Sequence, residues 1–313
     1  MLAGCDSRPD ASERAQWRKE AQEADSRVAA KAKRDDPNAR WTLHIGGQVA
    51  HPSDVTLAEL EQRPPVDIRV AKSEVWEEHA FRGVRISSLV EEAGPAPAAT
   101  TVTFLATDGY FATFDLADLK RHAIILAYEQ DGKAMLPAFG GPLSVRFDSR
   151  DIGPDLQRKY QSSDVFYVTH LIVGDEHASL RVGDRVFDDA ALSRLPETTV
   201  SGAVSYRSGW EATPQALHGV RLRDVLKGAG LTELPRAQIF GKAEIHQRTA
   251  TAPVFTGDTF DSCEPLLVRR FGAEHVNVPT RRGGPLLLYV NAICREKLGA
   301  NSWLAFVERV EVR

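Results

Sequence analysis

The residues best able to do chemistry in this chain are its thiols, and only three occur: Cys5, Cys263 and Cys294. A thiolate can bind a soft metal, accept a lipid or form a disulfide. The nine histidines fall into no zinc-binding pattern, and the sequence has neither a nucleophile elbow nor a phosphate-binding glycine loop. The spacing of Cys263 and Cys294 also matches no zinc site. The sequence therefore predicts no catalytic residue and no metal ligand.

Two stretches of the chain read alike and define an internal repeat. Trp76 is followed by Phe81-Arg82-Gly83-Val84-Arg85-Ile86, and Trp210 is followed by Leu217-His218-Gly219-Val220-Arg221-Leu222. Each stretch is later followed by Gly-Gly-Pro-Leu and further apolar residues, at 140–143 and 283–286. This spacing is too long for a solenoid of short repeats. It predicts a tandem duplication of one α+β domain.

Hydrophobic patterning supplies the elements of each repeat. Residues 101–106 are apolar and β-branched, which is typical of a buried strand. Val84 to Ala93 predicts a helix that stops at Gly94, and residues 220–229 predict its counterpart.

Charge and composition divide the chain into three parts. Residues 1–40 are rich in Ala, Glu, Lys and Arg without a wide apolar stripe, which predicts a tether that is either a solvated helix or disordered. The first repeat is expected over residues 41–175 and the second over residues 179–313.

The order of the repeated motifs resembles the molybdopterin-binding domain of the sulfite oxidase family. The first repeat adds the segments ATDGYFATFDLADL (106–119) and AYEQDGKAM (127–135), and the second adds KLGANSW (297–303). The resemblance covers nearly all of residues 41–313 in two passes. It implies a tandem repeat of a mixed-sheet, sulfite-oxidase-type α+β domain, and it implies redox chemistry as the ancestral function.

The family carries a cysteine a few residues before the tryptophan, and its thiolate binds molybdenum. Lys72 and Tyr206 stand at those positions here, and an ammonium or a phenol is a poor substitute for a soft thiolate. The resemblance therefore implies a vacated pocket around Lys72, Trp76, Asp108 and Tyr110. We expect no cofactor in this pocket.

The alternative is an oxidoreductase that still binds molybdopterin with an atypical set of molybdenum ligands. The pterin phosphate would then need a basic pocket. The arginines and lysine that could form one are Arg82, Arg85, Arg146 and Lys159.

The first residues bear on location. Leu2-Ala3-Gly4-Cys5 resembles a bacterial lipobox, where a lipoprotein precursor is cleaved and its cysteine acylated. A lipobox normally follows a basic and an apolar segment, so an accidental match is the alternative. The resemblance implies a lipid anchor on Cys5. In an oxidising periplasm, Cys263 and Cys294 could form a disulfide or stay two separate buried thiols.

The net charge of −4 predicts no nucleic-acid partner. No apolar run reaches the roughly 18–20 residues that span a bilayer. We therefore expect a periplasmic lipoprotein, anchored to the membrane by lipid, with two degenerate repeats. Its expected role is a non-catalytic binding or assembly module that contacts a protein partner in a redox complex.

Overall fold

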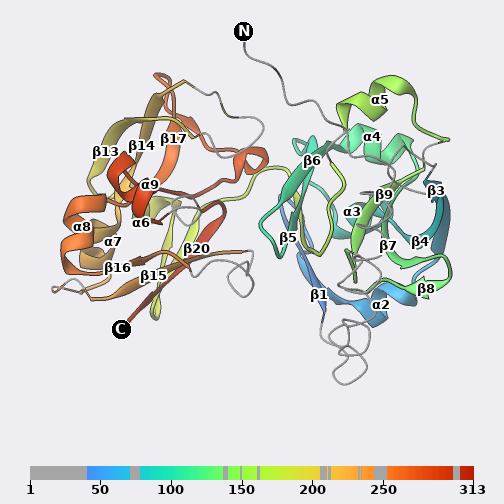
Figure 1. Cartoon of the computed structure of the whole chain (residues 1–313), viewed down its shortest axis with the longest axis horizontal. Coiled ribbons are helices and arrows are strands. Elements are labelled where there is room, and N and C mark those ends of the chain that lie inside the picture. Colours follow the sequence, from blue (N-terminus) through green and yellow to red (C-terminus); the bar gives the residue numbers. More distant parts are fainter. Residues whose placement is uncertain are drawn as a thin grey trace, which may run out of the picture.

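The structure is a computed structural model, and its elements fall into two lobes with the same topology (Figure 1). The first unit holds β1 to β10 and the second unit holds β11 to β20. The residues that the structure describes are 41–70, 78–136, 140–148, 150–160, 163–204, 210, 213–231, 233, 235–242, 252–298 and 304–313.

Each unit contains two five-stranded sheets. In the first unit, the β1 sheet has the order β2-β1-β10-β5-β6, and the β4 sheet has the order β3-β4-β7-β8 with β9 also paired to β7. The strands of the first unit are β1 (Thr42–Gly47), β2 (Ser53–Thr56), β3 (Pro65–Val70), β4 (His79–Arg85), β5 (Thr101–Ala106), β6 (Phe111–Asp115), β7 (Ile124–Gln130), β8 (Lys133–Ala134), β9 (Ser144–Phe147) and β10 (Val168–Val173).

The second unit repeats this plan strand for strand. Its β11 sheet has the order β12-β11-β20-β15-β16, and its β14 sheet has the order β13-β14-β17-β18 with β19 also paired to β17. The strands of the second unit are β11 (Ser179–Val182), β12 (Arg185–Asp188), β13 (Glu197–Gly202), β14 (Gln215–Arg221), β15 (Ala237–Gly241), β16 (Val254–Phe255), β17 (Leu266–Phe271), β18 (Val276–Asn277), β19 (Leu287–Tyr289) and β20 (Val307–Val312).

Short helices connect the strands, so the fold is α+β as predicted. In both units the first and last strands run parallel to each other, β1 beside β10 and β11 beside β20, and the remaining pairs are antiparallel. Among the described residues, no helix is long and apolar enough to cross a membrane. The helices are α2 (Leu57–Glu61), α3 (Ile86–Ala93), α4 (Leu116–Arg121), α5 (Pro154–Lys159), α6 (Asp189–Ser193), α7 (Leu222–Gly228), α8 (Gly257–Cys263), α9 (Ala292–Leu298) and the 3-10 turn η3 (Thr280–Arg282).

The Gly-Val-Arg motif ends a strand, whereas the sequence predicted that it begins a helix. Val84 pairs with Leu126 inside the β4 sheet, and α3 starts only after Arg85. The second unit behaves in the same way, because β14 runs through Arg221 before α7 begins. Sheet pairing of the β-branched valine outweighs its place in the helical pattern.

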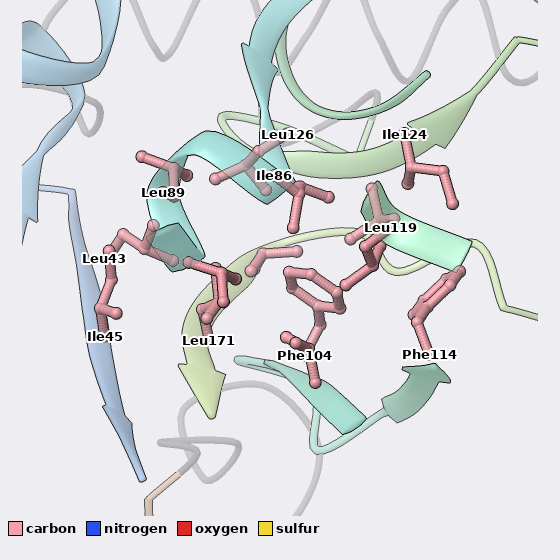
Figure 2. Packing of buried hydrophobic residues seen from close by; sticks show 14 of the residues in the cluster. Leu43, Ile45, Ile86, Leu89, Phe104, Phe114, Leu119, Ile124, Leu126 and Leu171 are labelled. Carbon is pink, nitrogen blue, oxygen red and sulfur yellow. The ribbon is translucent and has the colours of Figure 1, made fainter. Parts of the chain in front are cut away.

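Each unit has its own core between its two sheets. In the first unit, Phe104 and Phe114 pack edge to face with ring centroids 5.6 Å apart, and Ile86 and Leu89 of α3 and Leu119 of α4 pack into the same core (Figure 2). On β7, Ile124, Leu126 and Tyr128 belong to this core, so every second side chain of the strand points into it. The labelled members of the core are Leu43, Ile45, Ile86, Leu89, Phe104, Phe114, Leu119, Ile124, Leu126 and Leu171.

A third apolar cluster joins the two units. Leu105, Phe111 and Ile172 point away from the first core, on the outer face of the β1 sheet. They pack against the outer face of the β14 sheet, and Phe111 meets Phe306 edge to face at 5.0 Å. The members from the second unit are Val204, Leu217, Leu266, Val268, Val278, Leu287, Tyr289, Ala305 and Phe306. The units are therefore packed against each other by their sheets.

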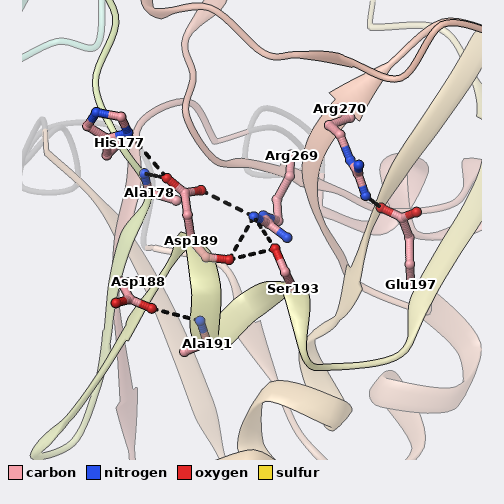
Figure 3. Close-up of polar contacts among 9 residues, drawn as sticks. All are labelled: His177, Ala178, Asp188, Asp189, Ala191, Ser193, Glu197, Arg269 and Arg270. Atoms are coloured by element: carbon pink, nitrogen blue, oxygen red, sulfur yellow. Dashed lines mark hydrogen bonds and ion pairs between the residues drawn. The ribbon is translucent and has the colours of Figure 1, made fainter.

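Polar contacts fix the connection between the units. The Thr280 backbone N–H donates to Asp175 at 2.8 Å. Beyond it, the Ala178 backbone N–H donates to the Asp189 carboxylate at 3.2 Å, and the guanidinium of Arg269 donates to the backbone carbonyl of Asp189 and to the hydroxyl of Ser193 (Figure 3). The connection is thus held at both of its ends by the second unit.

The two cysteines of the second unit are joined. Cys263 at the end of α8 and Cys294 in α9 form a disulfide, with their Cα atoms 5.1 Å apart. Both residues are buried in the core of the second unit. The disulfide links two helices that lie next to each other, and the first unit contains no cysteine.

Candidate cofactor site

The outer face of the β4 sheet, in the first unit, is the counterpart of the face that joins the units in the second. Five apolar side chains form a small cluster on it: Ile68, Phe81, Ile125, Ala127 and Met135. All five are buried. On β7, Ile125 and Ala127 alternate with Ile124, Leu126 and Tyr128 of the first core, which places the cluster on the opposite side of the sheet.

A buried arginine stands on this apolar face. Arg146 on β9 is only 8% exposed. Its guanidinium carbon lies 4.4 Å from the ring centre of Phe166 and 5.0 Å from that of Phe81. Such contacts with aromatic faces stabilise a cation that has lost its water. The strand position of Arg146 therefore brings a positive charge onto an otherwise apolar surface.

The charge of Arg146 is only partly balanced. Its Nη1 lies 3.1 Å from the carboxylate of Asp164, a residue whose own side chain is half exposed. The Nε of Arg146 is buried and has no hydrogen-bond partner among the described residues. Burial lowers the pKa of Arg146, and the nearby Asp164 works against this change. A buried donor without a partner costs free energy, so Nε is positioned to donate to an acceptor.

The second unit fills the same position differently. Strand register makes Tyr289 the counterpart of Arg146, because Val145 pairs with Leu126 on β7 and Leu288 pairs with Leu267 on β17. Tyr289 is buried in the cluster that joins the units. The face that carries a cation in the first unit is thus apolar in the second and covered by the first unit.

Three loops of the first unit meet beside Arg146. The Thr107 backbone N–H donates to the Tyr167 carbonyl at 3.1 Å, and the Tyr167 N–H donates to the Gly140 carbonyl at 3.0 Å. Gly140 has φ +84°, and a Cβ on it would lie 1.9 Å from the ring of Phe166. Only glycine fits there. The first Gly-Gly-Pro motif therefore lets the Phe166 ring reach Arg146.

The predicted pocket residues divide into three groups. Lys72 and Trp76 lie outside the described residues, as does Tyr206. Asp108 and Tyr110 form the turn between β5 and β6, where the Asp108 carboxylate accepts the Tyr110 N–H at 2.9 Å and Tyr110 packs against the first core. Arg146 occupies the outer face of the β4 sheet.

The other predicted phosphate ligands lie elsewhere and have partners. Arg82 lies 3.4 Å from the Asp67 carboxylate on the neighbouring strand. Arg85 donates to Ser87 and to the carbonyl of His122. Lys159 pairs with two carboxylates, which raise the pKa of its ammonium. The structure therefore leaves Arg146 as the one cation among these four that is both buried and incompletely paired.

Sequence reasoning missed Phe81, Phe166 and Asp164 as partners of Arg146. Phe81 was visible only as part of the repeated motif, and its outward direction depends on the bulge between Arg82 and Gly83. Asp164 and Phe166 lie in the approach to β10, far along the sequence from Arg146 in β9. Pattern alone gives no signal for that contact.

The part of the chain that contains this face matches a known family model. Residues 29–148 match the family model of the oxidoreductase molybdopterin binding domain. The match includes the β4 sheet and Arg146. This part of the chain is therefore similar to the molybdopterin-binding domain of an oxidoreductase family.

Two individual proteins were also found to be similar. The chain is 26% identical over 111 residues to the uncharacterized oxidoreductase YuiH of Bacillus subtilis, an alignment that covers 33% of this chain and 54% of YuiH. The chain thus spans about half the length of this curated relative. Among solved structures, the sulfane dehydrogenase SoxCD from Paracoccus pantotrophus aligns with a TM-score of 0.36 and 16% identity, over 88% of this chain and 78% of that one.

The prediction that the chain binds no cofactor is wrong. The family match points to molybdopterin binding. The prediction treated loss of the metal-binding cysteine as loss of the whole cofactor. A dehydrated guanidinium with an unpartnered Nε still suits an anionic, aromatic molecule.

The residues fit the two parts of that cofactor unequally. Arg146 between two aromatic rings fits a negatively charged pterin. No thiolate for the metal is present in the described part of the first unit, and the cysteines of the second unit are both in a disulfide. The described residues also contain no group of three or more His, Cys, Asp or Glu that could hold a metal ion. The organic part fits, and a thiolate-bound metal does not.

Proposed function

We propose that this chain binds one molybdopterin, on the outer face of the β4 sheet, as a non-catalytic binding or assembly module. The first unit would hold the cofactor, and the second unit would serve as its structural partner. Support comes from the molybdopterin-binding domain at residues 29–148 and from the buried, incompletely paired Arg146 within it.

The difference between Arg146 and Tyr289 is the observation that carries this proposal. The two residues occupy matching strand positions. Tyr289 packs in the apolar cluster between the units, where Phe111 also lies. A cofactor could reach the second face only if the units separated, and separation would expose many buried apolar side chains. We therefore expect one cofactor site per chain, in the first unit.

Arg146 would bind an anionic group of the pterin through its Nε and guanidinium. Phe81 and Phe166 hold that guanidinium in a fixed direction and keep water from it. Molybdopterin, when bound, supplies the dithiolene that carries the metal in redox enzymes. Because the described residues offer no free thiolate to that metal, the proposed role includes no redox step.

The test is the cofactor content of protein purified from a host that makes molybdopterin. Bound pterin is released, oxidised and measured by its fluorescence, and molybdenum is measured by mass spectrometry on the same sample. The proposal predicts a single pterin per chain and an absorption spectrum without a band from a cysteine thiolate bound to molybdenum. Folded protein that carries no pterin would contradict it.

We further propose that the chain is an exported lipoprotein, anchored on the periplasmic face of a membrane through Cys5 and associated with a redox complex. The lipobox-like Leu2-Ala3-Gly4-Cys5 and the disulfide between Cys263 and Cys294 support this location. Expression in a Gram-negative host with a signal segment added before Leu2 tests it. The chain should fractionate with membranes, and Cys5→Ser should release it. Equal release of both forms would contradict the anchor.

A further inference from the structure

A cleft lies where the connection between the units meets the second unit. It has a volume of about 240 Å³. Its base contains Pro285, Phe306 and Val307, and Val186 forms an apolar rim that is 63% exposed. Clefts at the junction of two units are frequent ligand sites. The cleft is separate from the proposed cofactor face, which lies on the β4 sheet of the first unit.

Two carboxylates and one ammonium form the inner end of this cleft. The Nζ of Lys242 lies 3.4 Å from Oε1 of Glu176 and 3.9 Å from Oε2 of Glu308. Both distances exceed the 2.7–2.9 Å of a strong ion-pair hydrogen bond. The neighbouring His170 adds no charge, since burial lowers its pKa to about 3. With two negative groups and one positive group, the inner end carries a net negative charge.

The most deeply placed of these groups is incompletely satisfied. The Glu176 side chain is 14% exposed. Its Oε2 is buried and has no hydrogen-bond partner among the described residues. Burial raises the pKa of Glu176, which shows that its charge is costly where it stands. A second donor beside Oε2 would lower that cost.

The outer end of the cleft has the opposite charge. Arg181 on β11 lines the cleft and also lines the adjoining groove that contains Arg309 and Arg313. Arg309 pairs with Glu311, whereas Arg181 has no ion-pair partner within the described part of the chain. The lining of the cleft thus includes groups that attract a cation and a group that attracts an anion.

We propose that this cleft binds a small zwitterion of the amino-acid kind with an apolar side chain. Its ammonium would enter between Glu176 and Glu308, and its carboxylate would meet the guanidinium of Arg181. The side chain would rest against Val186 and Pro285. This site is independent of the cofactor face and stands whether or not molybdopterin binds.

Calorimetric titration of the full chain with L-valine and two of its fragments tests the proposal. Isobutylamine lacks the carboxylate of valine, and 3-methylbutanoate lacks its ammonium. Valine should bind more tightly than either fragment. 3-Methylbutanoate should bind most weakly, because it brings a negative charge to a cleft whose Glu176 and Glu308 already outnumber Lys242. No heat from valine up to about 10 mM would overturn the proposal. Equal or tighter binding of either fragment would also overturn it.

Variants of Arg181 and Glu308 measure how much each end of the cleft contributes to valine binding. Arg181→Gln should weaken valine about tenfold and leave isobutylamine unchanged, because only valine has a carboxylate to lose. Glu308→Gln should weaken both. Both positions are at the surface, so folding should be kept. Arg194→Gln, an arginine outside the cleft, is the matched control and should bind valine as the parent does. Unchanged valine binding in Arg181→Gln would overturn the proposal.

Discussion

Corresponding sheet faces of the two units carry different residues, because one face is covered by the other unit and its counterpart is not. On the outer face of the β4 sheet, β9 presents Ser144 and Arg146, while the same positions on β19 are Leu287 and Tyr289. The β19 residues are covered by the first unit. The β9 residues are not part of that contact. An apolar pair marks the face that joins the units, and a buried cation marks the face that we propose binds the cofactor.

The β1 and β11 sheets show the opposite arrangement, because here the face in the first unit is covered and its counterpart in the second unit is not. On β10, His170 and Ile172 face the second unit, and register makes Arg309 and Glu311 their counterparts on β20. No further unit covers the β11 sheet among the described residues, and there the matching residues are charged and paired with each other. Comparing matching positions therefore shows which sheet faces are contacts and which are open.

The largest effect should come from breaking the contact between the units. Phe111→Ala removes a buried ring that packs on Phe306. We expect the free energy of unfolding to fall by about 3–5 kcal/mol. Hydrogen exchange should rise in β14 and β17 of the second unit, although the mutation lies in the first. The control Phe114→Ala removes a ring from the first core and should raise exchange there alone. Unchanged exchange in β17 for Phe111→Ala would show that the contact does not couple the units.

The disulfide should stabilise one unit and not the other. Cys263 and Cys294 are separated by 31 positions, and closing a loop of that size contributes about 3–4 kcal/mol on the chain-entropy model. The double variant Cys263→Ala/Cys294→Ala should lower the free energy of unfolding of the second unit in urea. Hydrogen exchange in the first core should stay the same. An equal loss in both units would mean that they unfold as one.

Acid should act mainly on the first unit. Hydrogen bonds to Lys159 and Tyr160 lower the pKa of Asp118 against the effect of burial, and hydrogen bonds likewise lower the pKa of Asp131 and Asp148. A carboxyl with a depressed folded pKa stabilises the fold above its unfolded pKa of about 3.9, and this stabilisation is lost as pH falls through the folded value. All three of these carboxyls lie in the first unit, so loss of their charge in acid should weaken that unit.

Pepsin digestion between pH 4 and 2 measures this difference. As pH falls, peptides from residues 41–173 should appear before peptides from residues 179–313. Asp118→Asn should make the first unit less stable at pH 7 and less sensitive to the fall in pH. Earlier cleavage of the second unit would contradict the assignment.

The smallest effect on stability should come from Arg146. Arg146→Met keeps the apolar contacts with Phe81 and Phe166 and removes the buried charge. Asp164 is half exposed, so water can replace the lost partner. We expect the free energy of unfolding of the cofactor-free protein to change by less than about 1 kcal/mol. A loss of several kcal/mol in urea denaturation would show that Arg146 has a structural role instead.

Much of the fold was predictable because it is repeated and locally patterned. The helix that ends at Gly94 was predicted to its last residue, and Gly94 adopts the left-handed conformation that ends helices. The contact between Phe111 and Phe306 was not predictable, because it joins strands from different units. The sequence also predicted Arg146 as a possible phosphate-binding residue, but not its partners. Asp164 and Phe166 contact Arg146 only in the folded chain.

The connection after β3 shows why positions in the two units cannot be matched by their distance from a shared motif. This connection spans residues 71–78 in the first unit and 203–214 in the second, so it is longer in the second. Counting back from the tryptophans therefore compares positions in loops of different length. The strand register of β3 and β13 is the firmer guide to equivalence, because paired strands leave no room for such an offset.

The most direct test of the account compares the pterin content of three purified proteins: the parent chain, Arg146→Met and Arg82→Met. Arg82 lies on the same sheet and has its own partner in Asp67, which makes it a matched control. We predict a single pterin per chain in the parent and in Arg82→Met, and a loss of about tenfold or more in Arg146→Met. Full pterin content in Arg146→Met, or two pterins per parent chain, would contradict a single site at Arg146.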